Sequence, residues 1–124
     1  MKTDSFFYIF GQNVPKQNMS KVENITFGEY IRQLRERENL PLRKVAAELD
    51  IDTSTLSKIE KNERNANDQI IDGLSKIFNE DKSDMKIRYL SDKISYLLLG
   101  EENSIEILKV AEEKIKYLKS TSKL

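Results

Sequence analysis

The 124-residue chain contains no cysteine and no histidine. A disulfide framework, a thiol nucleophile, a zinc site built from Cys and His, and a histidine general base are therefore all excluded. Glycine and proline are also scarce, at 4 and 2 residues, while charged residues make up 34% of the chain. This composition favours a helical protein over an all-β or a disordered one. The length fits one domain with a short appendage.

The chain also lacks net charge, since Lys+Arg and Asp+Glu both number 21. The simplest sign of a nucleic-acid-binding protein, a strongly basic domain, is thus absent, although a local basic face is not excluded. No apolar run approaches the roughly 18 residues that a membrane span needs. The longest run, residues 6–10, is too short and too aromatic for a secretory signal. We therefore expect a cytoplasmic protein without a membrane partner.

No constellation of catalytic residues is evident. The letters S-x-x-K occur at Ser83–Lys86, but Ser83 is better explained as a helix cap. The four glycines lie too far apart to form a phosphate-binding loop. Asp50 and Asp52 lack the neighbouring ligands that a cation would need. We expect neither an enzyme nor a bound cofactor or metal.

From residue 26 onward, apolar residues recur with the spacing of amphipathic helices. Capping boxes at Thr26–Glu29 and Asn103–Glu106 mark two helix starts, and Pro41 and Asn67 mark two others. The pattern predicts an all-α fold of five to six helices, over residues 26–39, 42–49, 53–61, 67–78, 83–99 and 104–118. We divide the chain into an aromatic arm and linker (1–25), a helix–turn–helix domain (26–80) and C-terminal helices (81–124).

The helix–turn–helix segment carries the functional information. Residues 34–40, 45–51 and 53–61, in this order and spacing, resemble the lambda-repressor/Cro-like (XRE) helix–turn–helix family. The resemblance continues through residue 78 and covers slightly under half the chain. It implies a small DNA-binding transcriptional regulator of lambda-repressor-like fold, whose third helix enters the major groove of double-stranded DNA.

The resemblance also implies roles for individual residues. Base edges would be contacted by the outer face of the third helix, through Thr53, Ser54, Ser57 and Lys58. Phosphates would be contacted by Arg43, Lys61, Asn62 and Arg64. Arg35 matches a family arginine that forms a structural ion pair with the glutamate ending the third helix, here Glu60. Taken alone, these hydroxyl and basic residues are more often helix caps and a solvated face, but the whole block favours DNA contact.

Three positions depart from the family pattern. Leu42 replaces a glutamine that often braces a phosphate contact, which puts that contact in doubt. Asp50 replaces the usual turn glycine, and aspartate accepts the left-handed conformation less readily than glycine but better than most residues. Ala66 stands near a position that is often proline. None of the three changes argues against the fold.

Two apolar stripes follow the helix–turn–helix domain, whose own helices already supply a small core. A symmetric dimer would cover them, and it would hold two recognition helices about 34 Å apart on two half-sites. The residues expected to form this homodimer interface are Ile87, Leu90, Ile94, Leu97, Leu98, Ile105, Leu108, Ile115 and Leu118.

The resemblance suggests a regulator that acts on a palindromic or near-palindromic operator, controls its own promoter, and serves a restriction–modification locus, the last by family analogy only. The alternative is a protein-interaction module or antitoxin whose C-terminal helices bind a partner protein. The aromatic arm leaves three alternatives open: a segment that docks on a partner subunit, a disordered segment, or the product of a start codon upstream of a natural start at Met19.

Overall fold

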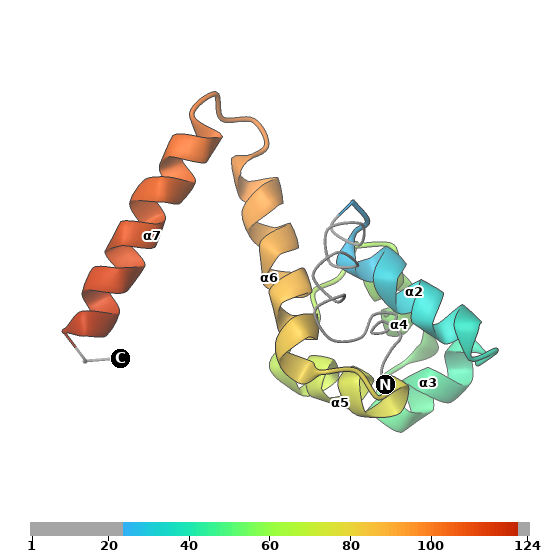
Figure 1. The fold of residues 1–124 in the computed structure, drawn as a ribbon. Coiled ribbons are helices and arrows are strands. Elements are labelled where there is room, and N and C mark those ends of the chain that lie inside the picture. Colours follow the sequence, from blue (N-terminus) through green and yellow to red (C-terminus); the bar gives the residue numbers. More distant parts are fainter. Residues whose placement is uncertain (1–23, 122–124) are drawn as a thin grey trace. The chain divides into compact units, whose positions relative to one another are not determined.

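The computed structural model describes residues 24–121, so the aromatic arm lies outside the described residues. The described part contains six helices and no strand: α2 (Phe27–Arg37), α3 (Leu42–Leu49), α4 (Thr53–Glu60), α5 (Asp68–Phe78), α6 (Lys82–Leu98) and α7 (Ser104–Ser120) (Figure 1). The all-α fold expected from the sequence is confirmed. The helix limits agree with the predicted ones to within about two residues.

The chain divides into two compact units that meet between Asp92 and Lys93. In the first unit, α2 to α5 pack around one core, and Met85 from α6 lies fully buried in it. This unit therefore continues into α6, past the boundary at residue 80 that the sequence led us to expect. The largest fully buried side chains are Ile31, Val45, Leu56, Ile59, Ile71, Leu74 and Met85.

Helices α2 to α5 each end at a non-glycine residue with positive φ. These residues are Asn39, Asp50, Asn62 and Asn79, with φ of 57°, 59°, 63° and 55°. Asparagine and aspartate tolerate the left-handed conformation better than other residues with a side chain. The backbone N–H groups that follow then turn back to the last carbonyls of each helix, as in a Schellman motif. The chain thus makes four sharp helix ends without a glycine.

The N-terminus of α2 is capped from three places in the sequence. Thr26 Oγ1 accepts a hydrogen bond from the third N–H of the helix (3.1 Å), and Asn62 Oδ1 accepts one from the second (3.1 Å). The carboxylate of Asp92, on α6, accepts one from the first. The predicted capping box is thus only half formed, because the Glu29 carboxylate pairs with Arg32 (2.8 Å). These bonds fix both the loop after α4 and α6 to the start of α2.

Helix α6 uses one face to join the first unit. The Tyr89 ring packs edge-on against Phe27, with ring centroids 5.0 Å apart, and its hydroxyl accepts a hydrogen bond from the Ala66 N–H (3.0 Å). The Arg88 guanidinium lies over the ring of Tyr30, 4.1 Å from its centroid. Away from this face, Ile87 is 53% exposed. The first half of α6 therefore presents an unburied apolar stripe on its other side.

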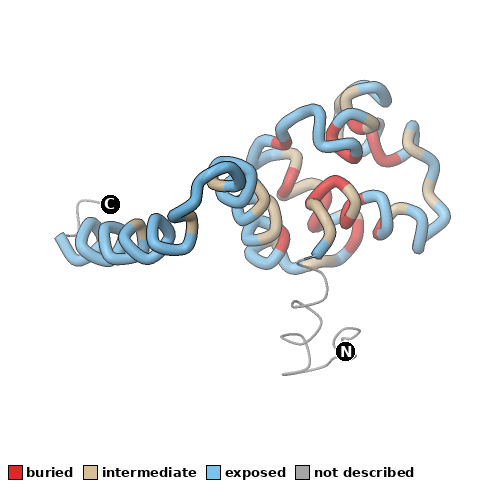
Figure 2. Tube along the Cα trace, turned by 90° about the horizontal axis from the view of Figure 1, so that it is seen from above, coloured by how far each residue is buried: buried red, intermediate tan, exposed pale blue. Residues whose placement is uncertain are grey.

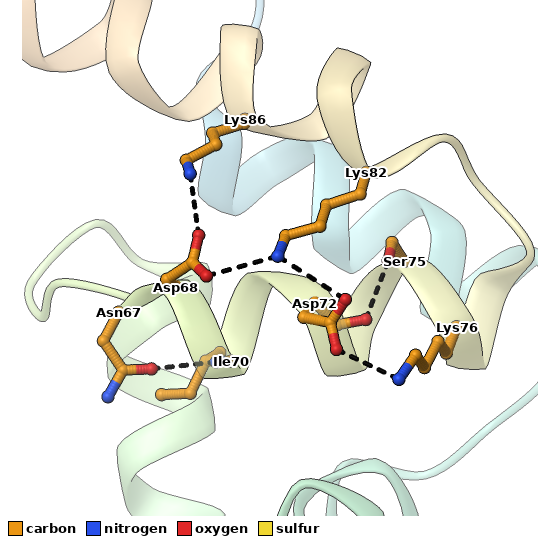
Figure 3. Close-up of polar contacts among 8 residues, drawn as sticks. All are labelled: Asn67, Asp68, Ile70, Asp72, Ser75, Lys76, Lys82 and Lys86. Atoms are coloured by element: carbon orange, nitrogen blue, oxygen red, sulfur yellow. Dashed lines mark hydrogen bonds and ion pairs between the residues drawn. The ribbon is translucent and has the colours of Figure 1, made fainter. Parts of the chain in front are cut away.

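An ion-pair network also links α6 to α5 (Figure 3). Asp68 accepts from Lys86 Nζ (2.8 Å) and Lys82 Nζ (3.2 Å), and Asp72 pairs with Lys76 (3.1 Å) and Lys82 (3.6 Å). Hydrogen bonds from Lys86 and Lys82 lower the pKa of the Asp68 carboxyl, and the one from Lys76 lowers that of Asp72. All of these groups are solvent-exposed, so the network orients α6 more than it stabilises the fold.

The network predicts a pH-dependent effect of Asp68→Asn. A carboxyl whose pKa is lowered in the folded state stabilises the protein above its unfolded pKa, and this contribution disappears as the pH falls through the folded pKa. We expect the variant to melt slightly below the parent at neutral pH and low salt. The difference should vanish in strong acid, and also at about 1 M salt. Melting curves at several pH values measure it, and a gap that grew toward acid would contradict the ion-pair assignment.

Helix α7 has no buried residue (Figure 2). Its expected capping box is wrong, because Asn103 occupies the N-cap position but its side chain makes no capping hydrogen bond. The expected interface residues remain largely uncovered on both C-terminal helices. Those exposed by more than a third are Ile87, Leu90, Ile94, Leu97, Ile105, Leu108, Ile115 and Leu118, whereas Leu98 is half-buried.

Candidate nucleic-acid interface

Helices α3 and α4 form a helix–turn–helix joined by three residues, 50–52. The turn is closed by hydrogen bonds from the Asp50 N–H to the Ala47 carbonyl (3.1 Å) and from the Ile51 N–H to the Ala46 carbonyl (3.0 Å). Ala46 is buried, and its small side chain suits a close crossing of the two helices. Asp50 adopts the left-handed conformation that this turn requires. The replacement of the usual glycine is therefore accommodated.

Helix α4 is held to the core by one face only. Leu56 and Ile59 are buried, as is Glu60 at its end. The opposite face carries the predicted base-contacting residues, which lie one and four residues apart and so share one side of the helix. Thr53, Ser54 and Lys58 are exposed on it, and Ser57 is half-buried. The structure thus brings all four onto one accessible surface.

Three of the four predicted phosphate-contacting residues flank this surface with free side-chain ends. Arg43 is exposed in the first turn of α3, and Lys61 is exposed at the C-cap of α4. Arg64 is exposed in the following loop, where its Nη1 lies 3.4 Å from the Thr55 hydroxyl. Positive charge is therefore available at both ends of the helix–turn–helix.

The fourth residue, Asn62, has its side chain engaged inside the protein. Its Oδ1 accepts from the Gly28 N–H (3.1 Å), and its Nδ2 donates to the Thr26 hydroxyl (2.9 Å). Both polar atoms of the amide thus brace the loop against the start of α2. The sequence resemblance placed Asn62 at a phosphate and gave no sign of this bracing role. An asparagine just past a helix end was the available signal for its left-handed backbone only.

The helix N-termini differ in a way that bears on anion binding. Helices α2 and α5 are capped by the side chains of Thr26 and Asn67, as expected. Helices α3 and α4 have no side-chain capping hydrogen bond. The first turn of α3 contains no acidic residue and includes Arg43, so its unpaired N–H groups are suited to a phosphate. The carboxylate of Asp52 makes the start of α4 less suitable.

A buried ion pair fixes the end of α4 against α2. Arg35 Nε donates to Glu60 Oε2 (2.7 Å) and Arg35 Nη2 donates to Glu60 Oε1 (3.1 Å), which makes the pair bidentate. Arg35 Nη1 also donates to the Leu40 carbonyl (2.9 Å). The side chains are only 13% and 5% exposed, and the hydrogen bond to Glu60 raises the pKa of Arg35. Neither charge is available to DNA.

The basic residues of this surface are offset by acidic neighbours. Glu48, Asp50, Asp52 and Glu63 are all exposed on or beside the helix–turn–helix. A single copy should therefore bind DNA weakly and with strong dependence on salt. Within residues 24–121, no group of three or more His, Cys, Asp or Glu residues could hold a metal ion. None of the helices in this range is long and apolar enough to cross a membrane.

Comparison with protein families matches residues 31–85 to the Helix-turn-helix family. No curated protein and no solved structure matches the chain. The matched segment begins within α2 and ends at Met85, the α6 residue that completes the core of the first unit. It therefore contains the whole α3–turn–α4 surface together with the core that positions it.

Proposed function

Since residues 31–85 belong to the lambda-repressor/Cro-like helix–turn–helix family of DNA-binding transcriptional regulators, we propose that the chain acts as a homodimer that reads a palindromic or near-palindromic operator. The observation that carries the proposal is the outer face of α4. It is accessible, it holds three hydroxyl groups and Lys58, and nothing in the described residues covers it. Hydroxyls can donate to or accept from base edges, and a lysine can reach guanine O6 or N7.

The flanking contacts would fix the register of this helix on the duplex. Arg43 with the start of α3, and Lys61 and Arg64 after α4, lie on either side of the outer face of α4. Such contacts orient the protein but carry no sequence information. We assign Asn62 to bracing the loop, since its amide already has two partners within the protein.

Dimerisation is supported by the uncovered apolar residues of α6 and α7. Two weakly binding domains held together gain affinity, because the second half-site is bound intramolecularly. Such a regulator would respond to its own concentration and control its own promoter in the cytoplasm. By family analogy the locus would be a restriction–modification one.

A second candidate function has an observation of its own. Because α7 has no buried residue, it could instead present its apolar face to an unlike protein, as in an antitoxin that binds its toxin. In that case the helix–turn–helix would serve as a scaffold. The two functions differ in what the outer face of α4 does.

A titration of labelled DNA from immediately upstream of the gene, followed by fluorescence anisotropy at two salt concentrations, tests the proposal. A shuffled duplex of equal composition is the reference. We expect the upstream DNA to bind about a hundredfold tighter, a difference of roughly 2.7 kcal/mol. The double variant Ser57→Ala/Lys58→Ala should lose most of this preference, since each good base contact contributes about 1–3 kcal/mol.

The variant Lys61→Glu/Arg64→Glu should instead weaken binding to both duplexes alike and reduce the dependence on salt. Lys76→Gln, which removes an exposed charge on α5 outside the proposed surface, is the matched control and should change neither affinity. If the Ser57/Lys58 variant bound as the parent does, the base-reading role of α4 would be wrong. The partner-binding function would then be the better explanation.

A further inference from the structure

Helix α7 cannot be stable as the structure leaves it. It has 17 residues and buries none of them, although Ile105, Leu108, Ile115 and Leu118 form one apolar stripe along it. Ile105 is 62% exposed and Leu118 is 49% exposed. An isolated helix of this length is marginal in water, and helices in proteins depend on packing of their apolar face. The stripe therefore needs a partner.

The spacing of the stripe identifies that partner. From Ile105 the steps to Leu108, Ile115 and Leu118 are three, seven and three residues. These steps read the same in both directions along the helix, about a point between Ala111 and Glu112. Two copies of α7 laid antiparallel would therefore set Ile105 against Leu118 and Leu108 against Ile115 in both halves of the pair. A two-fold interface requires such self-complementarity.

The charges along this segment favour the same arrangement. Glu101, Glu102 and Glu106 lie at its N-terminal end, whereas Lys114, Lys116 and Lys119 lie at its C-terminal end. An antiparallel pair brings the acidic end of one copy beside the basic end of the other, and also opposes the two helix dipoles favourably. A parallel pair would set like charges side by side.

The centre of the stripe is compatible with a close approach of two helices. Ala111 has a small side chain there. The adjacent Glu112 would meet its own copy, but its carboxylate is already paired with Lys116 of the same helix (3.4 Å). Repulsion between the two copies of Glu112 is therefore reduced where the helices come closest.

We infer that α7 of one copy packs antiparallel against α7 of a second copy, about a two-fold axis beside Ala111 and Glu112. This inference deepens the proposed function, since it names the surface and the orientation of the homodimer on which that function rests. It assigns the apolar stripe of α7 to self-association and not to an unlike protein.

The absence of cysteine makes cross-linking a direct test in the full-length protein. With a short bis-maleimide, Ala111→Cys should give a covalent dimer of twice 14.5 kDa, because the two thiols lie beside the axis. Glu112→Cys, an exposed position, should do the same and guards against a folding defect in the first variant. Leu118→Cys alone should not cross-link, since the two copies would lie about 20 Å apart along the helix. Mixed with Ile105→Cys after subunit exchange, it should.

Several outcomes would overturn the inference. A self-cross-link of Leu118→Cys would show a parallel pair, and a non-cross-linked dimer would show that another surface is used. A protein that stays at 14.5 kDa at all concentrations would show that α7 packs elsewhere. The same samples, titrated with upstream and shuffled DNA, separate this inference from the proposed function. A protein that retains its DNA preference while α7 fails to cross-link would contradict the orientation only.

Discussion

Replacing Arg35 with alanine will lower the free energy of unfolding by about 3–5 kcal/mol, because it leaves the carboxylate of Glu60 buried without its partner. The Glu60 side chain is only 5% exposed, and both of its oxygens accept from the guanidinium. The variant also removes a donor from the Leu40 carbonyl. Urea unfolding followed by helical circular dichroism measures the loss. DNA binding should fall with it, since the pair holds the end of α4 against α2.

Two companion variants separate burial from charge. Arg32→Ala removes an arginine from the same helix whose ion pair with Glu29 is exposed, so it should change stability by less than about 0.5 kcal/mol. The double variant Arg35→Met/Glu60→Leu removes both buried charges and should recover much of the stability lost by Arg35→Ala. A double variant as unstable as the single one would mean that the loss arises from packing and not from the unpaired carboxylate.

Local sequence signals predicted most of the fold. The apolar periodicity gave each helix, Thr26 and Asn67 were recognised as caps, and Asp50 was expected to adopt the left-handed conformation. These features depend on residues within a few positions of one another, so the sequence displays them directly. Asn103 shows the limit of this reasoning, because a residue type suited to a cap made no capping bond.

The contacts that assemble these helices were not predictable in the same way. The N-terminus of α2 is completed by Asn62 and by Asp92, which lie 34 and 65 residues away from the N–H groups they accept from. The hydroxyl of Tyr89 accepts from the N–H of Ala66, a hydrogen bond that a proline at that position could not donate. This bond gives a physical reason for one departure from the family pattern. Each of these pairs exists only once the chain has folded.

The candidate interface was predicted in kind by the family resemblance and not by local chemistry. Three hydroxyls near a helix start read equally well as caps, and the charges of the segment nearly cancel. The structure adds that the outer face of α4 is accessible and that Asn62 is engaged elsewhere. The identity of the bases remains beyond both, since small hydroxyl side chains adapt to several base edges.

Gly28→Ala will destabilise the protein by about 3 kcal/mol, because a methyl group cannot fit between α2 and α4. A Cβ at this position would lie 2.4 Å from the carbonyl oxygen of Glu60 and 2.6 Å from that of Ile59. Both are backbone atoms at the end of α4, so relief requires one helix to move. Since each kcal/mol shifts the melting temperature of a small domain by roughly 4–8 °C, a fall of more than about 10 °C is expected.

The other glycines of the described chain provide graded controls for this prediction. At Gly100 an added Cβ meets nothing within 4 Å, so Gly100→Ala should melt at or slightly above the parent temperature. At Gly73 it would meet only Cδ2 of Leu49, 2.6 Å away, and this flexible side chain can turn aside at a smaller cost. A Gly28→Ala protein that melts with Gly100→Ala would contradict the close crossing of α2 and α4. If it melts early, as expected, the residual folded protein should also lose affinity for the upstream DNA, because the displaced element is the one that carries the proposed reading face.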